Sequence, residues 1–248
     1  MAEDLWEASA GWWQATFTGG VDAEYDEQIL PLAAQHLEGA TSVLDIGTGE
    51  GQIARLAATG DARRVVGVDP TVGQLDAART RGGGPAYSRA VATALPFADA
   101  SFDAAVACLV FEHIEDADGA LAEVGRVLAD GGRFLFFLNH PLLQVPGSGW
   151  IDDQVLDPPE QYWRVGEYLT EVVSLEQVDH GVTLPFAHRT LSTYVNALAA
   201  AGLYVTHLDE PAPPPTLLAH APEYERADAI PRLLAIVTEK LPRPAVAS

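Results

Sequence analysis

Between residues 41 and about 139, short apolar segments alternate with segments of helical pattern. GQIARLAATG (51–60), VGQLDAART (72–80) and DADGALAEVGRVLADGG (116–132) have helical spacing. Strands that alternate with helices predict a doubly wound, parallel α/β sheet, and the strongly apolar run within 132–139 is typical of a strand covered on both faces. The expected strands are TSVLDI (41–46), VVGVD (65–69), a less regular YSRAVATALPF (87–97), FDAAVACLVF (102–111) and GRFLFFLN (132–139).

The pattern breaks after residue 139. Residues 140–187 are rich in Pro, Gly, Asp and aromatic side chains, and we expect a long irregular segment there. Such a segment is usually functional or disordered, and its aromatic content argues against disorder. Regular structure is predicted again for a helix at 189–202, a strand at 203–210 and a last apolar segment at 230–241.

Charge and composition exclude several classes of protein. The chain has 248 residues, a formal net charge of −21, and 14 Lys and Arg against 35 Asp and Glu, which disfavours a nucleic-acid partner. No apolar run reaches the roughly 20 residues of a membrane helix, and the acidic N-terminus lacks the basic start of a targeting peptide, so we expect a cytoplasmic protein. Cys108 is the single cysteine, and no His, Cys or Asp set has a regular metal-ligand spacing, so no metal is predicted.

The glycine-rich stretch VLDIGTGEG (43–51) indicates what the chain binds. A dinucleotide loop would need a third glycine where Gln52 stands, and no Gly-Lys-Ser/Thr of a P-loop is present. Asp45 would repel a pyrophosphate but suits a cationic group, and Asp69, at the end of the next predicted strand, suits ribose hydroxyls. A ligand with a ribose and an amino acid but no phosphate fits both positions, and S-adenosylmethionine is such a ligand.

The sequence resembles the class I S-adenosylmethionine-dependent methyltransferases. The resemblance rests on VLDIGTGEG, VVGVDP, ATALPFADASFDAAVACLVFEHIED and LAEVGRVLADGGRFLF, in that order over residues 41–139. It implies a doubly wound, mostly parallel seven-stranded sheet. Many members carry an acidic residue for the adenine amino group where this chain has Val91, which leaves backbone groups to recognise the adenine. The implied cofactor-binding residues are Tyr25, Asp45, Gly47, Thr48, Gly49, Gly51, Asp69, Pro70, Ala92, Thr93 and Leu109.

The second half is similar to the tail of many small-molecule methyltransferases. LNHPLL, an aromatic-rich stretch and FAHRTLSTYVNALAAAGLYVTHLDEPAP carry this similarity, which implies a substrate cover. The segment GWWQATFTGGVDAEYDEQILP looks like a lid, with Tyr25 and either Trp12 or Trp13 closing over the cofactor. We therefore expect one domain with a lid (1–38), a cofactor-binding core (39–139), a cover insertion (140–187) and a C-terminal part that completes the sheet (188–248).

Histidines are the candidates for a general base, because an acceptor that loses a proton gains from one. His113 follows the fourth predicted strand, His140 follows the fifth, and His188 precedes the helix at 189–202. His180 stands beside a glycine and is expected at the surface. An acidic residue of the cover, Asp152 or Asp153, could instead bind a cationic amine.

Three functions remain open at this stage. The first is methyl transfer to a hydroxyl, amine or carbon of a small metabolite, with a partly apolar or aromatic acceptor favoured by the Trp and Tyr content of the cover. The second is non-catalytic binding of S-adenosylmethionine or its product, and the third is a nicotinamide oxidoreductase. A homodimer is possible.

Overall fold

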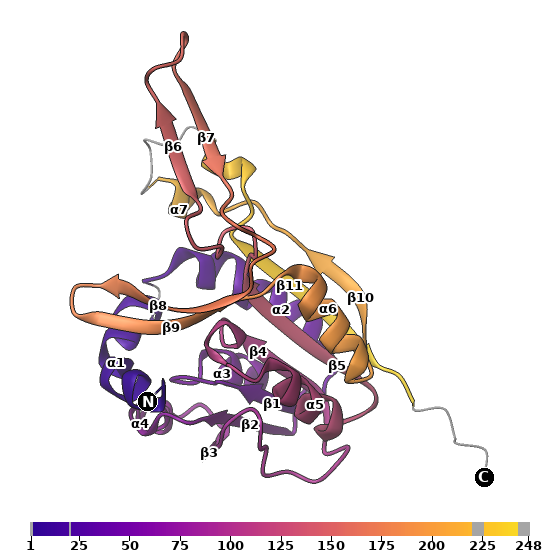
Figure 1. Ribbon diagram of the computed structural model, residues 1–248. Helices are drawn as coiled ribbons and strands as arrows, with labels where there is room; N and C mark the ends of the chain where they lie inside the picture. The colour runs from indigo at the N-terminus through magenta and orange to yellow at the C-terminus, as the bar shows by residue number, and fades with distance from the viewer. Residues whose placement is uncertain (1, 20, 220–225, 243–248) are drawn as a thin grey trace.

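A seven-stranded sheet forms the centre of the protein (Figure 1). The computed structural model describes residues 2–19, 21–219 and 226–242. The strand order is β10-β11-β5-β4-β1-β2-β3; β1 to β5 are parallel to one another, whereas β11 runs antiparallel to β5 and β10. This confirms the predicted mostly parallel, doubly wound sheet. The strands are β1 (Ser42–Ile46), β2 (Arg64–Asp69), β3 (Ala86–Arg89), β4 (Phe102–Cys108), β5 (Leu128–Asn139), β10 (Leu203–Asp209) and β11 (Leu233–Lys240).

Helices cover both faces of this sheet. Their bounds are α1 (Ala2–Phe17), α2 (Leu30–Leu37), α3 (Gln52–Thr59), α4 (Val72–Arg81), α5 (Ala117–Val127), α6 (Leu191–Ala200) and α7 (Pro215–Leu218), with short turns η1 (Tyr25–Ile29), η2 (Phe111–His113) and η3 (Ala227–Ala229). Within the described part of the chain, no helix combines the length and apolar character needed to cross a membrane.

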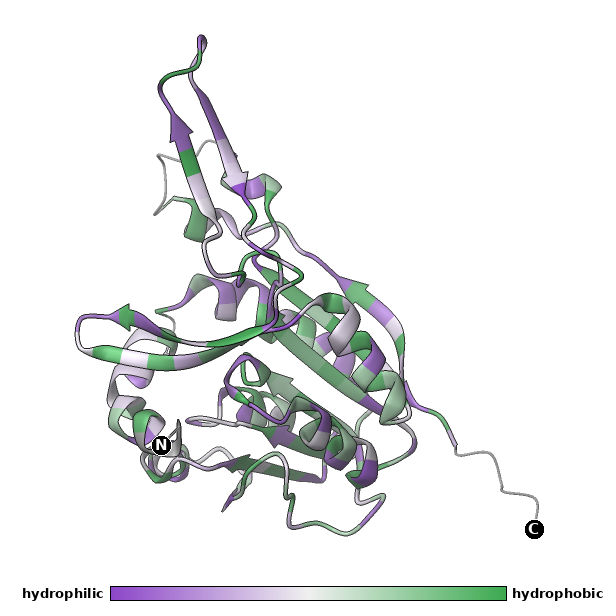
Figure 2. Cartoon of the chain, viewed as in Figure 1, coloured by the Kyte–Doolittle hydropathy of each residue, from purple (hydrophilic) through white to green (hydrophobic). Residues whose placement is uncertain are grey.

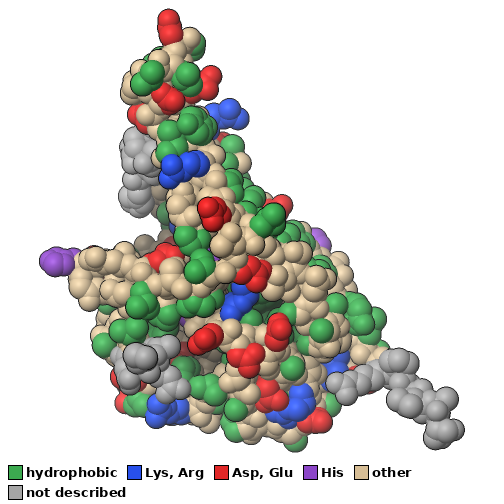
Figure 3. All heavy atoms as spheres, viewed as in Figure 1, with side chains coloured by type: hydrophobic (Ala, Val, Ile, Leu, Met, Phe, Trp, Pro, Cys, Tyr) green, Lys and Arg blue, Asp and Glu red, His purple; other side chains and the backbone are tan. Residues whose placement is uncertain are grey.

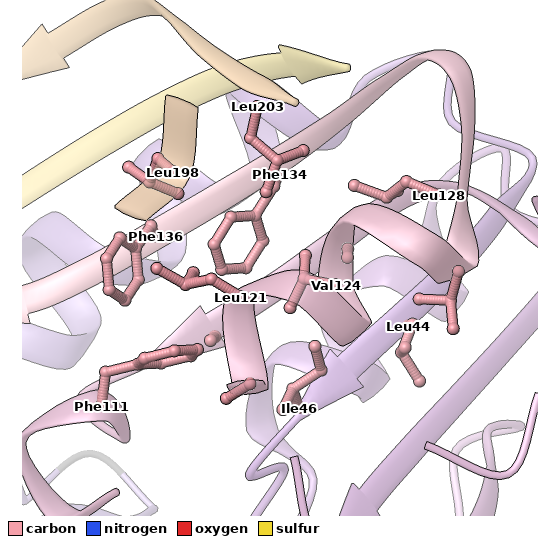
Figure 4. Close-up of a cluster of buried hydrophobic side chains, with 14 of the residues drawn as sticks. Leu44, Ile46, Phe111, Leu121, Val124, Leu128, Phe134, Phe136, Leu198 and Leu203 are labelled. Atoms are coloured by element: carbon pink, nitrogen blue, oxygen red, sulfur yellow. The ribbon is translucent and has the colours of Figure 1, made fainter. Parts of the chain in front are cut away.

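Alternate residues of β5 supply the two hydrophobic cores. Phe134 and Phe136 point toward α5 and α6, where they pack with Leu121 and Leu198 (Figure 4). The intervening Phe137 belongs to the second core, which includes Ile29 before α2. Both cores are almost free of solvent, and each fully buried side chain of this size contributes about 1.5–3 kcal/mol. In Figure 2 the central strands are accordingly drawn largely in the hydrophobic colour.

The helix predicted for residues 116–132 is wrong in its last five residues. α5 ends at Val127, and Leu128 already has extended backbone angles (φ −77°, ψ 140°) because it pairs with Phe102 of β4. Gly131 was expected to end the helix. It lies instead within β5, where its positive φ of +76° allows the strand to bend. The third predicted strand is also shorter than expected, since β3 ends at Arg89, and the last apolar segment is the strand β11.

The irregular segment expected at 140–187 is wrong as well, because it contains two antiparallel hairpins. These are β6 (Gly149–Asp153) with β7 (Glu160–Arg164), and β8 (Val172–Asp179) with β9 (Val182–His188). The first hairpin projects from the body of the protein, and the second extends toward α1 (Figure 1). The residues 140–187 therefore form a regular insertion between β5 and α6.

Candidate active site

A cavity of about 340 Å³ lies at the carboxyl ends of β1, β2 and β4, beneath the N-terminal helix. Open parallel sheets bind ligands at this edge, and the volume is within the range of small-molecule sites. Ten of the eleven residues predicted to bind the cofactor line this cavity. They are Tyr25, Asp45, Gly47, Thr48, Gly49, Asp69, Pro70, Ala92, Thr93 and Leu109.

The glycine loop after β1 leaves room for a ligand. Gly49 lines the cavity with φ +54°, and a Cβ atom built on it would meet no atom within 4 Å. A side chain at this position would thus occupy ligand space. Gly51 lies outside the cavity wall, at the N-cap position of α3, and has a φ of +88°. A Cβ atom on this residue would collide with the Tyr87 hydroxyl. The role of Gly51 is therefore to shape the loop.

Asp69 connects this loop to the end of β2. Its Oδ2 accepts a hydrogen bond from the Gly49 N–H at 3.0 Å, and its Oδ1 accepts one from the Thr71 N–H at 2.8 Å. The Thr71 side chain also interacts with this carboxylate. An ionised carboxylate can accept about four hydrogen bonds, so acceptor capacity remains for a ligand hydroxyl. Burial raises the pKa of this carboxyl, although the backbone hydrogen bonds oppose the shift.

Asp45 both lines the cavity and supports α3. Its Oδ2 accepts hydrogen bonds from the Thr48 hydroxyl at 2.6 Å and from the Ala54 N–H at 3.0 Å. Complete burial raises its pKa to about 6, and these two hydrogen bonds limit the shift. The carboxylate therefore lies at the cavity wall, and its Oδ2 is already hydrogen-bonded to two groups of the loop and of α3.

His113 is the predicted histidine that reaches the cavity. Its Nδ1 lies 2.7 Å from the Pro185 carbonyl oxygen, which can only accept, so Nδ1 carries the proton and Nε2 keeps the lone pair. The ring has edge-to-face contacts with Trp6 and Phe186, each with 4.6 Å between ring centroids. Burial lowers the pKa of His113 to about 4, so the imidazole is neutral near pH 7.

Comparison with known proteins places this geometry in a family. The family described as "Methyltransferase domain" matches residues 44–136. A demethylmenaquinone methyltransferase of Thermobifida fusca is 30% identical over 179 residues, which are 66% of this chain and 68% of that protein. The chain belongs to the class I S-adenosylmethionine-dependent methyltransferases.

Further similarities agree with this assignment. An N-demethylindolmycin N-methyltransferase of Streptomyces griseus is 28% identical over 195 residues, covering 75% of this chain and 79% of the relative. A crystal structure of an S-adenosylmethionine-dependent methyltransferase from Mesorhizobium loti superposes with a TM-score of 0.73 at 28% identity, over 88% of this chain and 98% of the other. Among the first three curated relatives, the match spans 55–79% of the relative's own length.

S-adenosylmethionine, the cofactor of this methyltransferase family, fits the residues of the cavity. The open space at Gly49 and the remaining acceptor capacity of Asp69 suit a ribose, and Asp45 offers a carboxylate to an ammonium group. Val91, Ala92 and Thr93 line the cavity together, and the valine side chain supplies no acceptor for an adenine amino group.

Leu109 is the strained residue of this methyltransferase cavity. It follows β4 with φ +54°, a backbone conformation that is uncommon for a side chain of this size. Its N–H donates to the Phe137 carbonyl oxygen at 3.0 Å, which holds the chain against β5. Such strain is concentrated at functional sites, and here it turns the chain from β4 toward η2 and His113.

The other two histidines predicted as catalytic do not line the cavity. His140 is buried, its Nε2 lies 2.8 Å from Glu210 Oε1, and its Nδ1 accepts from the Leu142 N–H, so the ring joins the end of β5 to the segment after β10. His188 donates from Nε2 to the Tyr168 carbonyl oxygen at 2.8 Å, and its Nδ1 is enclosed. Both rings occupy positions that stabilise the insertion and the chain around it.

Sequence reasoning missed Trp6, which lines the cavity together with Trp13. Their separation of seven residues places them on one face of α1, and this helical spacing is the signal that could have identified Trp6. Trp12 points elsewhere, because its Nε1–H donates to Asp179, the last residue of β8, at 2.7 Å. Of the two tryptophans expected over the cofactor, Trp13 is the one at the cavity.

The aromatic residues expected to cover the substrate lie outside the cavity wall. Trp150, Tyr162 and Trp163 belong to the projecting β6–β7 hairpin, where Trp150 and Trp163 pack edge-to-face. Phe186 of β9 reaches the site indirectly, through its contact with His113. Asp152 and Asp153 also lie on the projecting hairpin, and the space-filling view shows acidic side chains around its tip (Figure 3).

Proposed function

We propose that this methyltransferase acts on a small, partly aromatic acceptor that donates a hydrogen bond to His113 Nε2. The observation that carries the proposal is the position of His113 in the wall of the cavity, with its protonated nitrogen held by Pro185 and its ring packed against Trp6. An imidazole fixed in this way presents a hydrogen-bond acceptor in an aromatic setting. The names of the Thermobifida fusca and Streptomyces griseus relatives specify small organic molecules, demethylmenaquinone and N-demethylindolmycin.

In the proposed reaction, the chain aligns the acceptor and excludes water. When bound, S-adenosylmethionine supplies an electrophilic methyl group whose departure leaves a neutral thioether, so the protein need not protonate the leaving group. Trp6 and Trp13 shield the cavity from the side of α1, and alignment of two reactants is worth up to roughly 7–11 kcal/mol.

The acceptor must lose one proton for each methyl group gained. His113 holds that proton by a hydrogen bond to Nε2, while the low pKa of the imidazole, about 4, favours release of the proton to solvent after transfer. The proposed role is therefore to orient the nucleophilic atom rather than to retain the proton.

Transfer of a labelled methyl group tests the function directly. The wild-type protein is incubated with methyl-labelled S-adenosylmethionine and separate panels of quinols, phenols, indoles, aliphatic amines and carboxylic acids, and each product is analysed by mass spectrometry. We expect transfer to an aromatic member, at its oxygen, nitrogen or ring carbon. Binding of the cofactor without transfer to any panel would contradict the proposal and favour the non-catalytic binding protein.

Three narrower expectations belong to this proposal. The net charge of −21 supports the absence of a nucleic-acid partner. The expected cytoplasmic location rests on the sequence pattern alone, which has neither a membrane-length apolar run nor a basic targeting start. The possible homodimer is retained as an expectation, and sedimentation of the purified protein would test it.

A further inference from the structure

His36, His207 and Asp209 form a cluster outside the methyltransferase cavity. His36 lies in the last turn of α2, whereas His207 and Asp209 lie two residues apart on the edge strand β10 and so face the same side of the sheet. One ligand atom from each residue lies within 4.8 Å of the other two. None of the three residues lines the cavity that contains Asp69 and His113.

The distances in this cluster are close to those of a metal site. His207 Nε2 is hydrogen-bonded to Asp209 Oδ1 at 3.1 Å, a contact that a shared ion would replace, and His36 Nε2 is 3.8 Å from Asp209 Oδ2. Two ligand atoms on a tetrahedral zinc ion are separated by about 3.4 Å, given metal–ligand bonds of about 2.0–2.2 Å. Small side-chain rotations would therefore bring all three groups onto one ion.

Two atoms of the cluster are enclosed without a partner. His36 Nε2 and Asp209 Oδ2 are shielded from solvent, and neither has a hydrogen-bond partner among the residues that the structure describes. Their separation of 3.8 Å is too long for a hydrogen bond. Enclosed polar atoms without partners are costly, and a cation between these two atoms would satisfy both.

We propose that His36, His207 and Asp209 bind a divalent transition-metal ion, with zinc as the preferred occupant. Two imidazoles and one carboxylate suit zinc, nickel or copper better than magnesium or calcium, which prefer sets of oxygen ligands. The ion would join α2 to the edge strand β10 and thereby stabilise the folded chain. The proposal is independent of methyl transfer, because its ligands lie outside the cavity.

The test uses full-length protein treated with a chelator and then titrated with zinc chloride alone. Calorimetry gives the stoichiometry and affinity, and thermal unfolding gives the stabilisation. His207→Ala removes one exposed ligand, and His180→Ala is the matched control, because it removes an exposed imidazole from the β8–β9 turn. The unfolding temperature of each metal-free variant shows whether it has folded.

We expect one zinc ion per chain, with a higher unfolding temperature in zinc, for the wild type and for His180→Ala. His207→Ala should bind zinc at least about 10-fold more weakly, since even the partners of ligands contribute 10- to 100-fold. Equal affinity in His207→Ala would overturn the proposal, as would the absence of stoichiometric binding in the wild type. If His207→Ala did not fold, His36→Gln would be titrated in its place and judged by the same outcomes.

Discussion

The Gly49 N–H donates to Asp69 Oδ2 at 3.0 Å, so one hydrogen bond joins the glycine loop after β1 to the end of β2. The two residues are 20 positions apart in the chain, and both line the cavity. The loop therefore has a fixed position relative to the carboxylate that we expect to hold the ribose.

Replacement of Asp69 by Ala should weaken binding of S-adenosylmethionine by about 1–3 kcal/mol, because a ligand hydroxyl loses its acceptor. Calorimetric titration measures this change. Asp76→Ala is the matched control, since this carboxylate is exposed on α4 and forms a surface ion pair with Arg79. Equal affinities in the two variants would contradict the role of Asp69.

Gly49→Ala and Gly39→Ala separate backbone strain from loss of ligand space. Both glycines have positive φ, +54° and +74°, and a Cβ atom on either would meet no atom within 4 Å. Each variant should lose about 1–2 kcal/mol of unfolding free energy. Only Gly49→Ala should also lose cofactor affinity, because only Gly49 lines the cavity.

The measurements for this pair are urea unfolding and calorimetric titration. We expect similar stabilities in the two variants and a reduced cofactor affinity in Gly49→Ala alone. An unchanged affinity in Gly49→Ala would show that the cofactor does not approach the loop at this residue.

Replacement of His113 by Phe should reduce kcat/KM by about 10-fold while leaving cofactor affinity nearly unchanged, since one hydrogen bond to the acceptor is lost. The aromatic ring can keep its contacts with Trp6 and Phe186. In the wild type, the imidazole should contribute no ionisation to the activity profile above about pH 6, because its pKa is about 4.

Steady-state kinetics with the acceptor found by the transfer assay measures this effect. His180→Ala, at the turn of the β8–β9 hairpin, controls for loss of a histidine elsewhere. Full activity in His113→Phe would exclude the proposed orienting role.

The free energy of unfolding should fall as pH rises from about 4.5 to about 7, because Glu112 ionises in the unfolded state before it ionises in the folded state. Burial raises its pKa from 4.5 to about 7, so over this range the folded state binds more protons than the unfolded state. Its stabilising contribution is complete below the unfolded pKa and is lost as pH rises through the folded pKa. The effect is on the order of 3 kcal/mol.

Glu112→Gln removes this ionisation and preserves an oxygen for the Asn139 N–H, which donates to Glu112 Oε1 at 2.7 Å. Urea unfolding at several pH values should show that the difference in unfolding free energy between wild type and variant changes across this window. Parallel pH profiles for the two proteins would disprove the assignment.

Local pattern was sufficient for the sheet and for most of the cavity. Asp45 and Asp69 could be placed because they end adjacent parallel strands, whose carboxyl ends meet at one edge. The glycine spacing likewise identified a loop that leaves room for a ligand.

Long-range contacts explain what the sequence did not show. His140 was expected at the site because it follows β5, yet its ring turns to Glu210, 70 residues later in the chain. The end of α5 was misplaced because Leu128 pairs with Phe102, a contact that no helical pattern contains. The fold class was therefore predictable, whereas the division of histidines between structural and active-site positions depended on tertiary packing.

A crystal structure with S-adenosylhomocysteine bound would show directly whether this cavity holds the cofactor as proposed. The ribose hydroxyls should lie within hydrogen-bond distance of the Asp69 carboxylate, and the sulfur atom should lie on the side of the cavity that contains His113. Binding of the ligand outside this cavity, or with the sulfur directed away from His113, would contradict this proposal.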